Sequence, residues 1–207
     1  MTSIDALTLD VPDTAAAKAF YDSAFGIGDR LRFRTSDSPS SGFRGYVLSL
    51  VVPVPAVVDS LIEPALAAGA TAIKPAKKSF WGYGGVVAAP DGALWKVASS
   101  SKKETGAPAR QIDDIVLLIG ATDVAASKKF YVDHGLTVAK SFGRKYVEFA
   151  GGADAITLAL YGRKAAAKDA GVDPAGSGAH RLEITSDAGA FTDPDGFVWQ
   201  VHADVAG

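Results

Sequence analysis

The sequence predicts an α+β fold made of two related units, because the same turn and strand occur twice. A Pro-Asp-Gly turn, followed after two residues by Trp, lies at Asp91 and again at Asp195, 104 positions later. A Phe-Tyr pair begins at Phe20 and again at Phe130, 110 positions later. Two independent landmarks at nearly equal spacing indicate a duplicated unit.

The stretch between the two copies has the composition of a linker. Residues 99–110 read SSSKKETGAPAR, which is polar and contains Gly and Pro. We therefore divide the chain into a first unit at 1–98, a linker at 99–110 and a second unit at 111–207.

Both units open in the same way. An alternating apolar strand at 4–11 or 112–119 leads to a helix-capping side chain. The cap is Asp13 in the first unit and either Thr122 or Asp123 in the second. An alanine-rich helix with the Phe-Tyr pair on its buried side follows, and Gly26 or Gly135 should end it.

Beyond this helix the two units diverge. The first unit predicts strands at 45–52, 70–74, 84–89 and 93–98, and a helix at 56–68 that Pro64 should kink or split. The second predicts strands at 136–140, 145–150, 155–160, 181–185 and 197–203. It has no room for a second long helix between its last two strands, and we leave 162–178 unassigned.

Composition excludes several function classes. A net charge of −2 and a pI near 5.9 argue against a nucleic-acid partner. No run of about 18 apolar residues and no secretory leader are found, so we expect no membrane partner. The absence of Cys excludes disulfides and thiolate chemistry, and we expect a cytoplasmic protein.

The order of these motifs resembles the vicinal oxygen chelate superfamily, also called glyoxalase/bleomycin-resistance/dioxygenase-like. The resemblance spans nearly the whole chain and is most specific in FWGYGGVVAAPDGALWKVA at 80–98 and YGRKAAAKDAGVDPAGSG at 161–178. It implies two tandem βαβββ-type units whose curled mixed sheets form cups. Each unit is shortened: the first lacks middle strands, and the second lacks the second helix.

The resemblance also implies a divalent metal held by His and Glu from the first, fourth, fifth and last strands. In the first unit the first and last of these positions carry Ala6 and Lys96. Alanine has no lone pair to offer, and a lysine ammonium is only a donor. The first unit should therefore hold no metal.

The second unit has Asp114, either His180 or Arg181, and Gln200 at the equivalent positions. Because a neutral amide is a poor third ligand, we expect no cofactor and no bound metal. A divalent metal, if one binds, would use Asp114, His180 and Gln200. The simpler roles are an acidic residue at a strand edge, a hydrogen-bonded surface histidine and a solvent-facing glutamine.

The aromatic residues of SFWGYGG, at 79–85, are the candidate ligand-binding residues. Phe80, Trp81 and Tyr83, flanked by glycines at the rim of a cup, would form a stacking wall for a planar ligand. The alternative is that they pack a core. For Trp95 and Trp199 the core position is the expectation.

Three functions follow from the resemblance and these residues, and catalytic residues stay unassigned. The first is a bleomycin-resistance-like protein that binds a small planar or hydrophobic molecule without a standard metal site. The second is a metal-dependent glyoxalase-like lyase or isomerase, or a dioxygenase, with a degenerate site in the second unit. The third is an interaction protein whose cup is filled by side chains. We expect the two units to pair within the chain, and unpaired sheet edges leave room for a homodimer.

Overall fold

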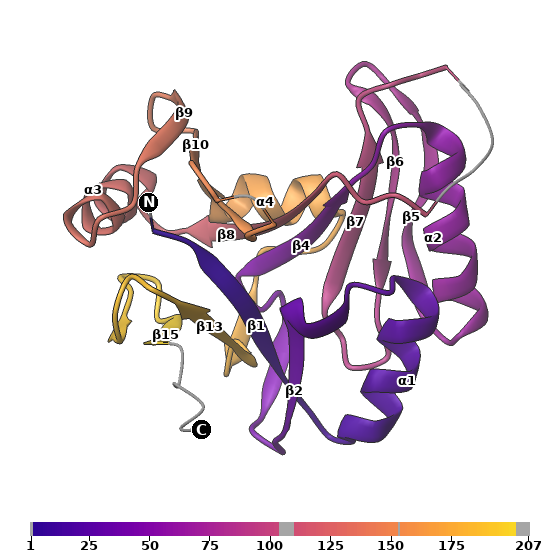
Figure 1. The fold of residues 1–207 in the computed structure, drawn as a ribbon, viewed down its shortest axis with the longest axis horizontal. Helices are drawn as coiled ribbons and strands as arrows, with labels where there is room; N and C mark the ends of the chain where they lie inside the picture. Colours follow the sequence, from indigo (N-terminus) through magenta and orange to yellow (C-terminus); the bar gives the residue numbers. More distant parts are fainter. Residues whose placement is uncertain (1, 104–109, 153, 202–207) are drawn as a thin grey trace.

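Two large mixed sheets organise the protein, whose computed structural model describes residues 2–103, 110–152 and 154–201 (Figure 1). The first has eight strands in the spatial order β5 (Thr71–Ser79), β6 (Gly82–Ala88), β7 (Leu94–Ser99), β4 (Tyr46–Val51), β8 (Asp114–Ala121), β11 (Thr157–Gly162), β10 (Tyr146–Phe149) and β9 (Val138–Phe142). The second has five, in the order β14 (Phe191–Thr192), β15 (Val198–Val201), β13 (Leu182–Ser186), β1 (Ile4–Val11) and β2 (Leu31–Thr35). The predicted α+β class is confirmed.

The eight-stranded sheet is two copies of one βαβββ module joined edge to edge. The first copy is β4, helix α2 (Pro55–Ala67), β5, β6 and β7, and the second is β8, helix α3 (Val124–Asp133), β9, β10 and β11. In each copy the first and last strands are parallel neighbours. The copies meet where β4 pairs antiparallel with β8, with Leu48 opposite Leu117.

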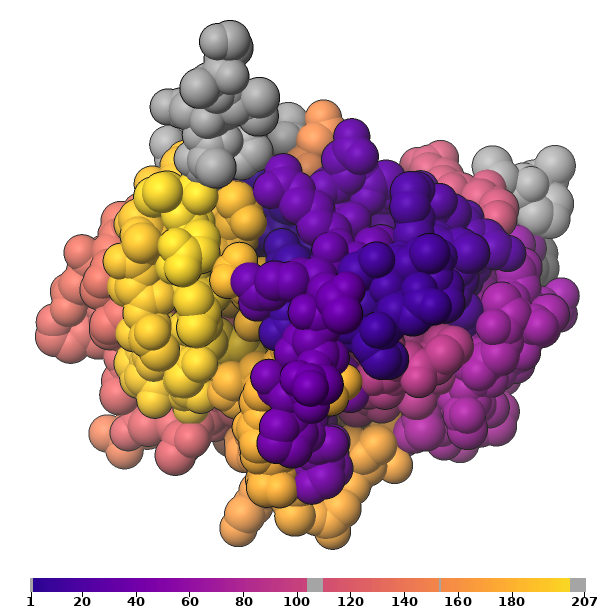
Figure 2. Space-filling model, turned by 90° about the horizontal axis from the view of Figure 1, so that it is seen from below, coloured from indigo at the N-terminus to yellow at the C-terminus, as the bar shows by residue number. Residues whose placement is uncertain are grey.

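The five-stranded sheet repeats this central arrangement with fewer outer strands. β1 is parallel to β2, β13 is parallel to β15, and β1 meets β13 antiparallel with Leu7 opposite Ile184. Each sheet thus takes strands from both sides of the expected linker, and Figure 2 shows the N-terminal and C-terminal segments side by side. Residues 104–109 of that linker, and the last two of the strand expected at 197–203, lie outside the described residues.

The helix signals in the sequence mark the true ends of two helices. Asp13 caps helix α1 (Thr14–Ala24) and Asp123 caps α3, each through hydrogen bonds from two backbone N–H groups of the first turn. Gly26 and Gly135 follow the two helices with φ of 62° and 89°. These positive angles favour glycine, so both helices end where the sequence indicates.

Pro64 does not split α2, although a split was one of the two outcomes that the sequence analysis expected. The helix is continuous through Pro64 and ends at Ala67. Proline removes one N–H donor from the ladder, and because Pro64 opens the last turn, only Ala65, Leu66 and Ala67 follow it in the helix. The apolar face holds the helix in place through Val57, Val58, Leu61, Ile62 and Ala65, which are all buried.

Several short elements were not predicted. They are the 3-10 turn η1 (Gly28–Arg30), the strands β2, β3 (Ser40–Gly42), β12 (Gly176–Gly178) and β14, and helix α4 (Arg163–Ala170). α4 lies in the segment that the sequence analysis left unassigned. β3 and β12 pair with each other as a separate ribbon.

The main core lies between the two sheets and includes α1, α2 and α3. Trp95 and Trp199 are fully buried there, so the core position expected for both is confirmed. No helix within the described residues is long and apolar enough to cross a membrane.

Candidate functional site

Helix α4 covers the centre of the face that would form the floor of a cup. In Figure 1 the eight-stranded sheet curves around it. Its buried side carries only alanines, Ala166, Ala167 and Ala170, which pack with Val47 and Leu118 of the sheet in a second hydrophobic cluster. Small side chains let the helix approach the strands closely, so the open part of this face lies to either side of α4.

Two lysines from the sheet hold the C-terminal end of α4. The Nζ of Lys96 lies 2.6 Å from Oδ2 of Asp169, and the Nζ of Lys74 donates to the carbonyl oxygens of Lys168 and Asp169 at 3.0 and 2.5 Å. Positive charge at a helix C-terminus is favourable because the last carbonyls carry partial negative charge. Lys96, at a position where the resemblance implies a metal ligand, is therefore the partner of a carboxylate.

A groove of about 260 Å³ lies between α4 and the β5–β6–β7 end of the sheet. We call it the Trp81 groove, and its walls include Lys74, Lys77, Trp81, Lys96 and Asp169. Glycines from β6 form part of its floor, and a Cβ on Gly84 would lie 2.7 Å from the carbonyl oxygen of Val97. The groove thus combines cationic walls, one indole and a floor of exposed backbone.

Phe80 and Trp81 form the two-residue tip of the β5–β6 hairpin. Both side chains are 83% exposed, and their rings meet edge to face with centroids 5.0 Å apart. The ammonium of Lys102 lies 5.6 Å from the centroid of the Phe80 ring. These aromatics do not pack a core, and Trp81 reaches the groove wall.

Tyr83 is not on the same side of the hairpin. Its hydroxyl donates to Oδ1 of Asp59 in α2 at 2.9 Å, on the opposite face of the sheet from α4. Tyr83 is among the residues that line the groove. Because successive residues of a strand point to opposite faces and the Tyr83 ring points toward α2, its backbone is the part that faces the groove. The structure therefore brings Trp81 together with lysines and glycines, and places the Tyr83 ring elsewhere.

The three residues named as conditional metal ligands do not come together. Asp114 precedes the core residue Ile115 on β8, and Gln200 follows the core residue Trp199 on β15, so both point away from the core from different sheets. Nδ1 and Nε2 of His180 lie 2.6 and 3.0 Å from the carbonyl oxygens of Arg44 and Asp195. Both ring nitrogens thus lie against backbone carbonyl oxygens, and the nitrogen that carries the proton donates to one of them.

The residues at the implied metal positions therefore do not fit a metal. Lys96 is a cation bound to Asp169, and the His180 ring has its nitrogens committed to backbone oxygens. Within the described ranges no group of three His, Cys, Asp or Glu side chains is arranged to hold an ion. The metal content of the protein stays a prediction.

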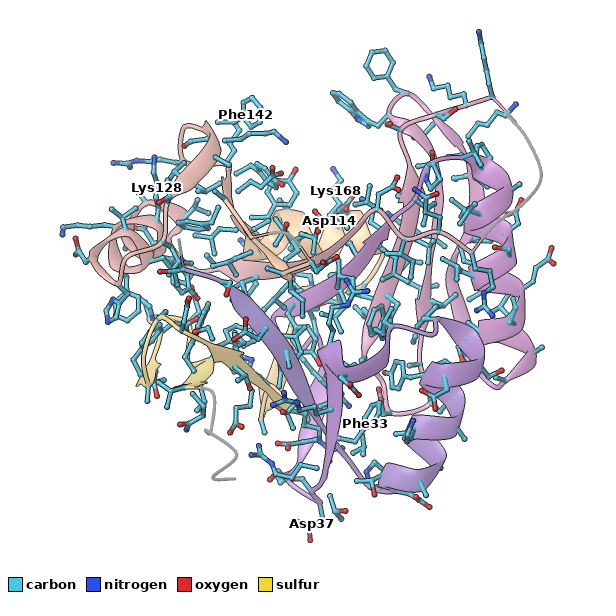
Figure 3. The ribbon with its side chains drawn as sticks, viewed as in Figure 1. Phe33, Asp37, Asp114, Lys128, Phe142 and Lys168 are labelled. Carbon is cyan, nitrogen blue, oxygen red and sulfur yellow. The ribbon has the colours of Figure 1, made fainter. Side chains whose placement is uncertain are left out.

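Asp114, labelled in Figure 3, lies at the start of β8 in a small polar cluster with Thr157 of β11. Thr157 donates to its Oδ1 at 3.1 Å. Burial raises the pKa of Asp114, the negative charge of Glu148 adds to the rise, and the Thr157 hydrogen bond opposes it. Glu148 accepts from Lys140 at 2.7 Å and Tyr146 at 2.8 Å, so its charge is already balanced.

The sequence analysis named Trp81 as a candidate but did not consider the cations around it as a site. Lys96 was identified only as a residue unable to bind a metal, and Lys74, Lys77 and Asp169 were not considered. A signal was present at Gly171, which ends α4 with φ of 87° after an alanine-rich stretch. With that helix recognised, Asp169 in its last turn would have been the natural partner for Lys96.

Comparison with solved structures identifies the fold. Glyoxalase I from Zea mays superposes with a TM-score of 0.62, covering 97% of this chain and 92% of that one at 13% identity. A proposed dioxygenase from Bacillus subtilis gives a TM-score of 0.63, covering 99% and 86% at 11% identity. Neither the family models nor the curated protein sequences give a match.

These likenesses confirm that the chain has the vicinal oxygen chelate fold. Both superpositions extend over nearly all of the chain, so they include the two sheets and not one module alone. At such identities they show the fold and leave the activity to be argued from the site.

Proposed function

We propose that the chain binds a small planar molecule in the Trp81 groove, without a metal in the site. One observation carries the proposal: Trp81 is 83% exposed and yet lines a groove of about 260 Å³. Exposing an indole forgoes its burial, which is worth a few kcal/mol for a large apolar side chain. A stacking surface for a planar ligand gives this exposure a function.

The charges of the groove favour a ligand that carries an acidic group. Lys74 and Lys96 are bound to the end of α4, so part of their charge is balanced there. Lys77 lines the same groove, and no hydrogen bond or ion pair joins its side chain to any other described residue. A planar anion could pair its acidic group with the Lys77 ammonium and stack its planar part on the Trp81 indole.

No observation favours the metal-dependent lyase, isomerase or dioxygenase. That activity would need Asp114, His180 and Gln200 to converge, and they lie on different parts of the fold. The proposed function therefore uses binding alone.

A fluorescent planar anion, 8-anilinonaphthalene-1-sulfonate, tests the proposal. We expect saturable binding to the folded protein, and a much weaker signal from the neutral analogue N-phenyl-1-naphthylamine. Trp81→Ala should weaken binding by about 1–3 kcal/mol, the amount lost when a stacking aromatic is removed. Trp81→Phe should recover part of the loss, and Lys77→Gln should weaken the anion more than the neutral analogue.

Lys129→Gln is the matched control, because Lys129 lies on α3 and is well exposed. Thermal melts of every variant separate a binding effect from unfolding. Trp81→Ala should change stability by less than about 0.5 kcal/mol, as an exposed substitution does. Binding that is unchanged in Trp81→Ala and Lys77→Gln would show that the groove is not the site.

A further inference from the structure

A second cavity, of about 230 Å³, lies at the base of the eight-stranded sheet, where β4 and β7 begin. It is at the opposite end of β7 from the Trp81 groove, since Leu94 starts this strand and Ser99 ends it. Its apolar walls include Phe43, Leu94 and Val172, and its polar walls include Arg44 and Tyr46. We call this cavity the Arg44 pocket.

The Tyr46 hydroxyl is buried without a hydrogen-bond partner. The side chain is 2% exposed, and its Oη lies close enough to the Arg44 guanidinium to feel its charge, yet no described residue meets it in hydrogen-bonding geometry. Buried polar groups are nearly always hydrogen-bonded, so an unsatisfied one in a cavity wall indicates a missing partner. Burial raises the pKa of Tyr46, and the phenol therefore keeps its proton and can donate.

Arg44 brings a positive charge to the same cavity. Its Nη2 donates to the carbonyl oxygen of Asp91 at 2.6 Å, and no ion pair joins it to a carboxylate among the described residues. A Cβ on Gly92, with φ of 87°, would lie 2.8 Å from that Nη2, so glycine gives the guanidinium its space. An arginine stays charged at any ordinary pH and keeps further N–H donors for a ligand.

The acidic residue in this wall does not cancel the charge. Asp173 is exposed, and its Oδ1 accepts from the backbone N–H of Ala175 at 2.7 Å. The cavity thus offers one guanidinium, one phenol donor and mostly apolar walls. Such a combination recognises a molecule that has an acidic end and an apolar body.

We propose that the Arg44 pocket is a second ligand site, which binds a small carboxylic acid with an aromatic or branched apolar body. The carboxylate accepts from the Arg44 guanidinium and the Tyr46 hydroxyl, and the body packs on Phe43, Leu94 and Val172. This site shares no lining residue with the Trp81 groove and does not depend on ligand binding there.

Calorimetric titration with benzoate tests the assignment, with benzyl alcohol as the neutral probe of the same shape. Wild type should bind benzoate in preference to benzyl alcohol. Tyr46→Phe should weaken benzoate about tenfold, since losing a hydrogen bond to a charged group costs this order of affinity. Arg44→Gln should abolish binding and Arg44→Lys should retain part of it.

Stability measurements keep the test decisive. Tyr46→Phe removes an unpartnered hydroxyl, so without ligand it should melt at or above the wild-type temperature. If the Arg44 variants fail to fold, Val172→Trp replaces them, because it fills the pocket from a half-buried loop position and should also abolish binding.

The outcomes separate the two sites. Loss of benzoate in Tyr46→Phe and Val172→Trp, with Trp81→Ala binding as wild type does, supports the Arg44 pocket. Loss in Trp81→Ala alone would place benzoate in the Trp81 groove and overturn this inference. Failure of wild type to bind benzoate would also overturn it, and would leave the Trp81 groove to its own test.

Discussion

The hydroxyl of Tyr21 in α1 donates a hydrogen bond to Oδ2 of Asp91, 2.7 Å away in the β6–β7 turn. The second repeat makes the same contact with a different aspartate. Tyr131 in α3 donates to Asp193, which lies two residues before Asp195, the residue that matches Asp91 in the repeated motif. Asp195 is thereby left to bind the start of α3 through the N–H of Thr122.

These tyrosine–aspartate pairs should contribute measurably to stability. Tyr131→Phe leaves the Asp193 carboxylate without its phenol donor. Tyr21→Phe does the same to Asp91 and also removes the acceptor of the Trp95 indole N–H, which donates to Tyr21 at 3.3 Å. Each variant should lose about 1–3 kcal/mol of unfolding free energy, measured by urea denaturation. Tyr46→Phe is the control, because its hydroxyl has no such partner. Equal losses in all three variants would contradict the assignment.

The raised pKa of Asp114 predicts a pH-dependent contribution to stability. Because burial raises this pKa above the ordinary 3.8, the folded state binds a proton more tightly than the unfolded state. This group therefore stabilises the fold most below pH 3.8, and its contribution is lost as the pH rises through the folded pKa. Asp114→Asn should gain unfolding free energy relative to wild type between pH 4 and neutrality.

Unfolding measured at several pH values checks this expectation. Asp5→Asn provides the matched control, because Asp5 is an exposed strand residue. A stability difference between Asp114→Asn and wild type that does not change with pH would show that Asp114 ionises normally.

The landmarks in the sequence predicted the two-sheet fold but not how the strands are shared. Asp13, Asp123, Gly26 and Gly135 each act locally, through a cap or a positive φ, and each marked a real helix end. The pairing of β1 with β13 joins residues about 180 positions apart, and no local pattern encodes such a contact. The sequence could therefore place most elements, while the order of modules in each sheet came from the structure.

The candidate site was predictable only where one residue carries the signal. Trp81, which Gly82 follows in SFWGYGG, was named as a candidate from the local pattern of aromatic residues and glycines. The Lys96–Asp169 pair joins β7 to α4 across 73 positions, and Tyr46 became notable only when its hydroxyl proved to be buried and unpartnered. Such features depend on the tertiary fold, which periodicity and composition do not report.

The Lys96–Asp169 pair should couple α4 to the sheet weakly but measurably. Both side chains are partly exposed, so a double-mutant cycle with Lys96→Met and Asp169→Asn should give about 0.2–1 kcal/mol of coupling. The coupling should shrink as salt is added. Lys129–Asp133, an exposed pair within α3, gives the reference for a pair that joins no two elements. Strict additivity would mean that the ion pair does not hold α4.

Purified protein should contain well under one equivalent of Zn, Ni, Mn or Fe per chain. The reason is that Lys96 and Gln200 stand where the resemblance implies a carboxylate, and both ring nitrogens of His180 lie against backbone carbonyl oxygens. Elemental analysis after dialysis measures this directly. Gln200→Glu is an informative companion: it should leave the metal content unchanged, because Asp114 and His180 lie elsewhere. Near one tightly held ion per chain would make the present ligand argument wrong.

The two halves of the chain should fold only together. Residues 2–103 supply one complete and one reduced module, and residues 110–201 supply the others. Separating them would expose β4 and β1 along the edges that now pair with β8 and β13, together with apolar side chains such as Leu48 and Leu7. Burying a side chain of this kind is worth roughly 1.5–3 kcal/mol, and the main core contains many such side chains from both halves.

Each half expressed alone should therefore aggregate or remain unfolded by circular dichroism, while the two co-expressed halves should purify as a one-to-one complex. Two halves that are each folded, monomeric and non-interacting would show instead that the boundary at 99–110 separates independent domains.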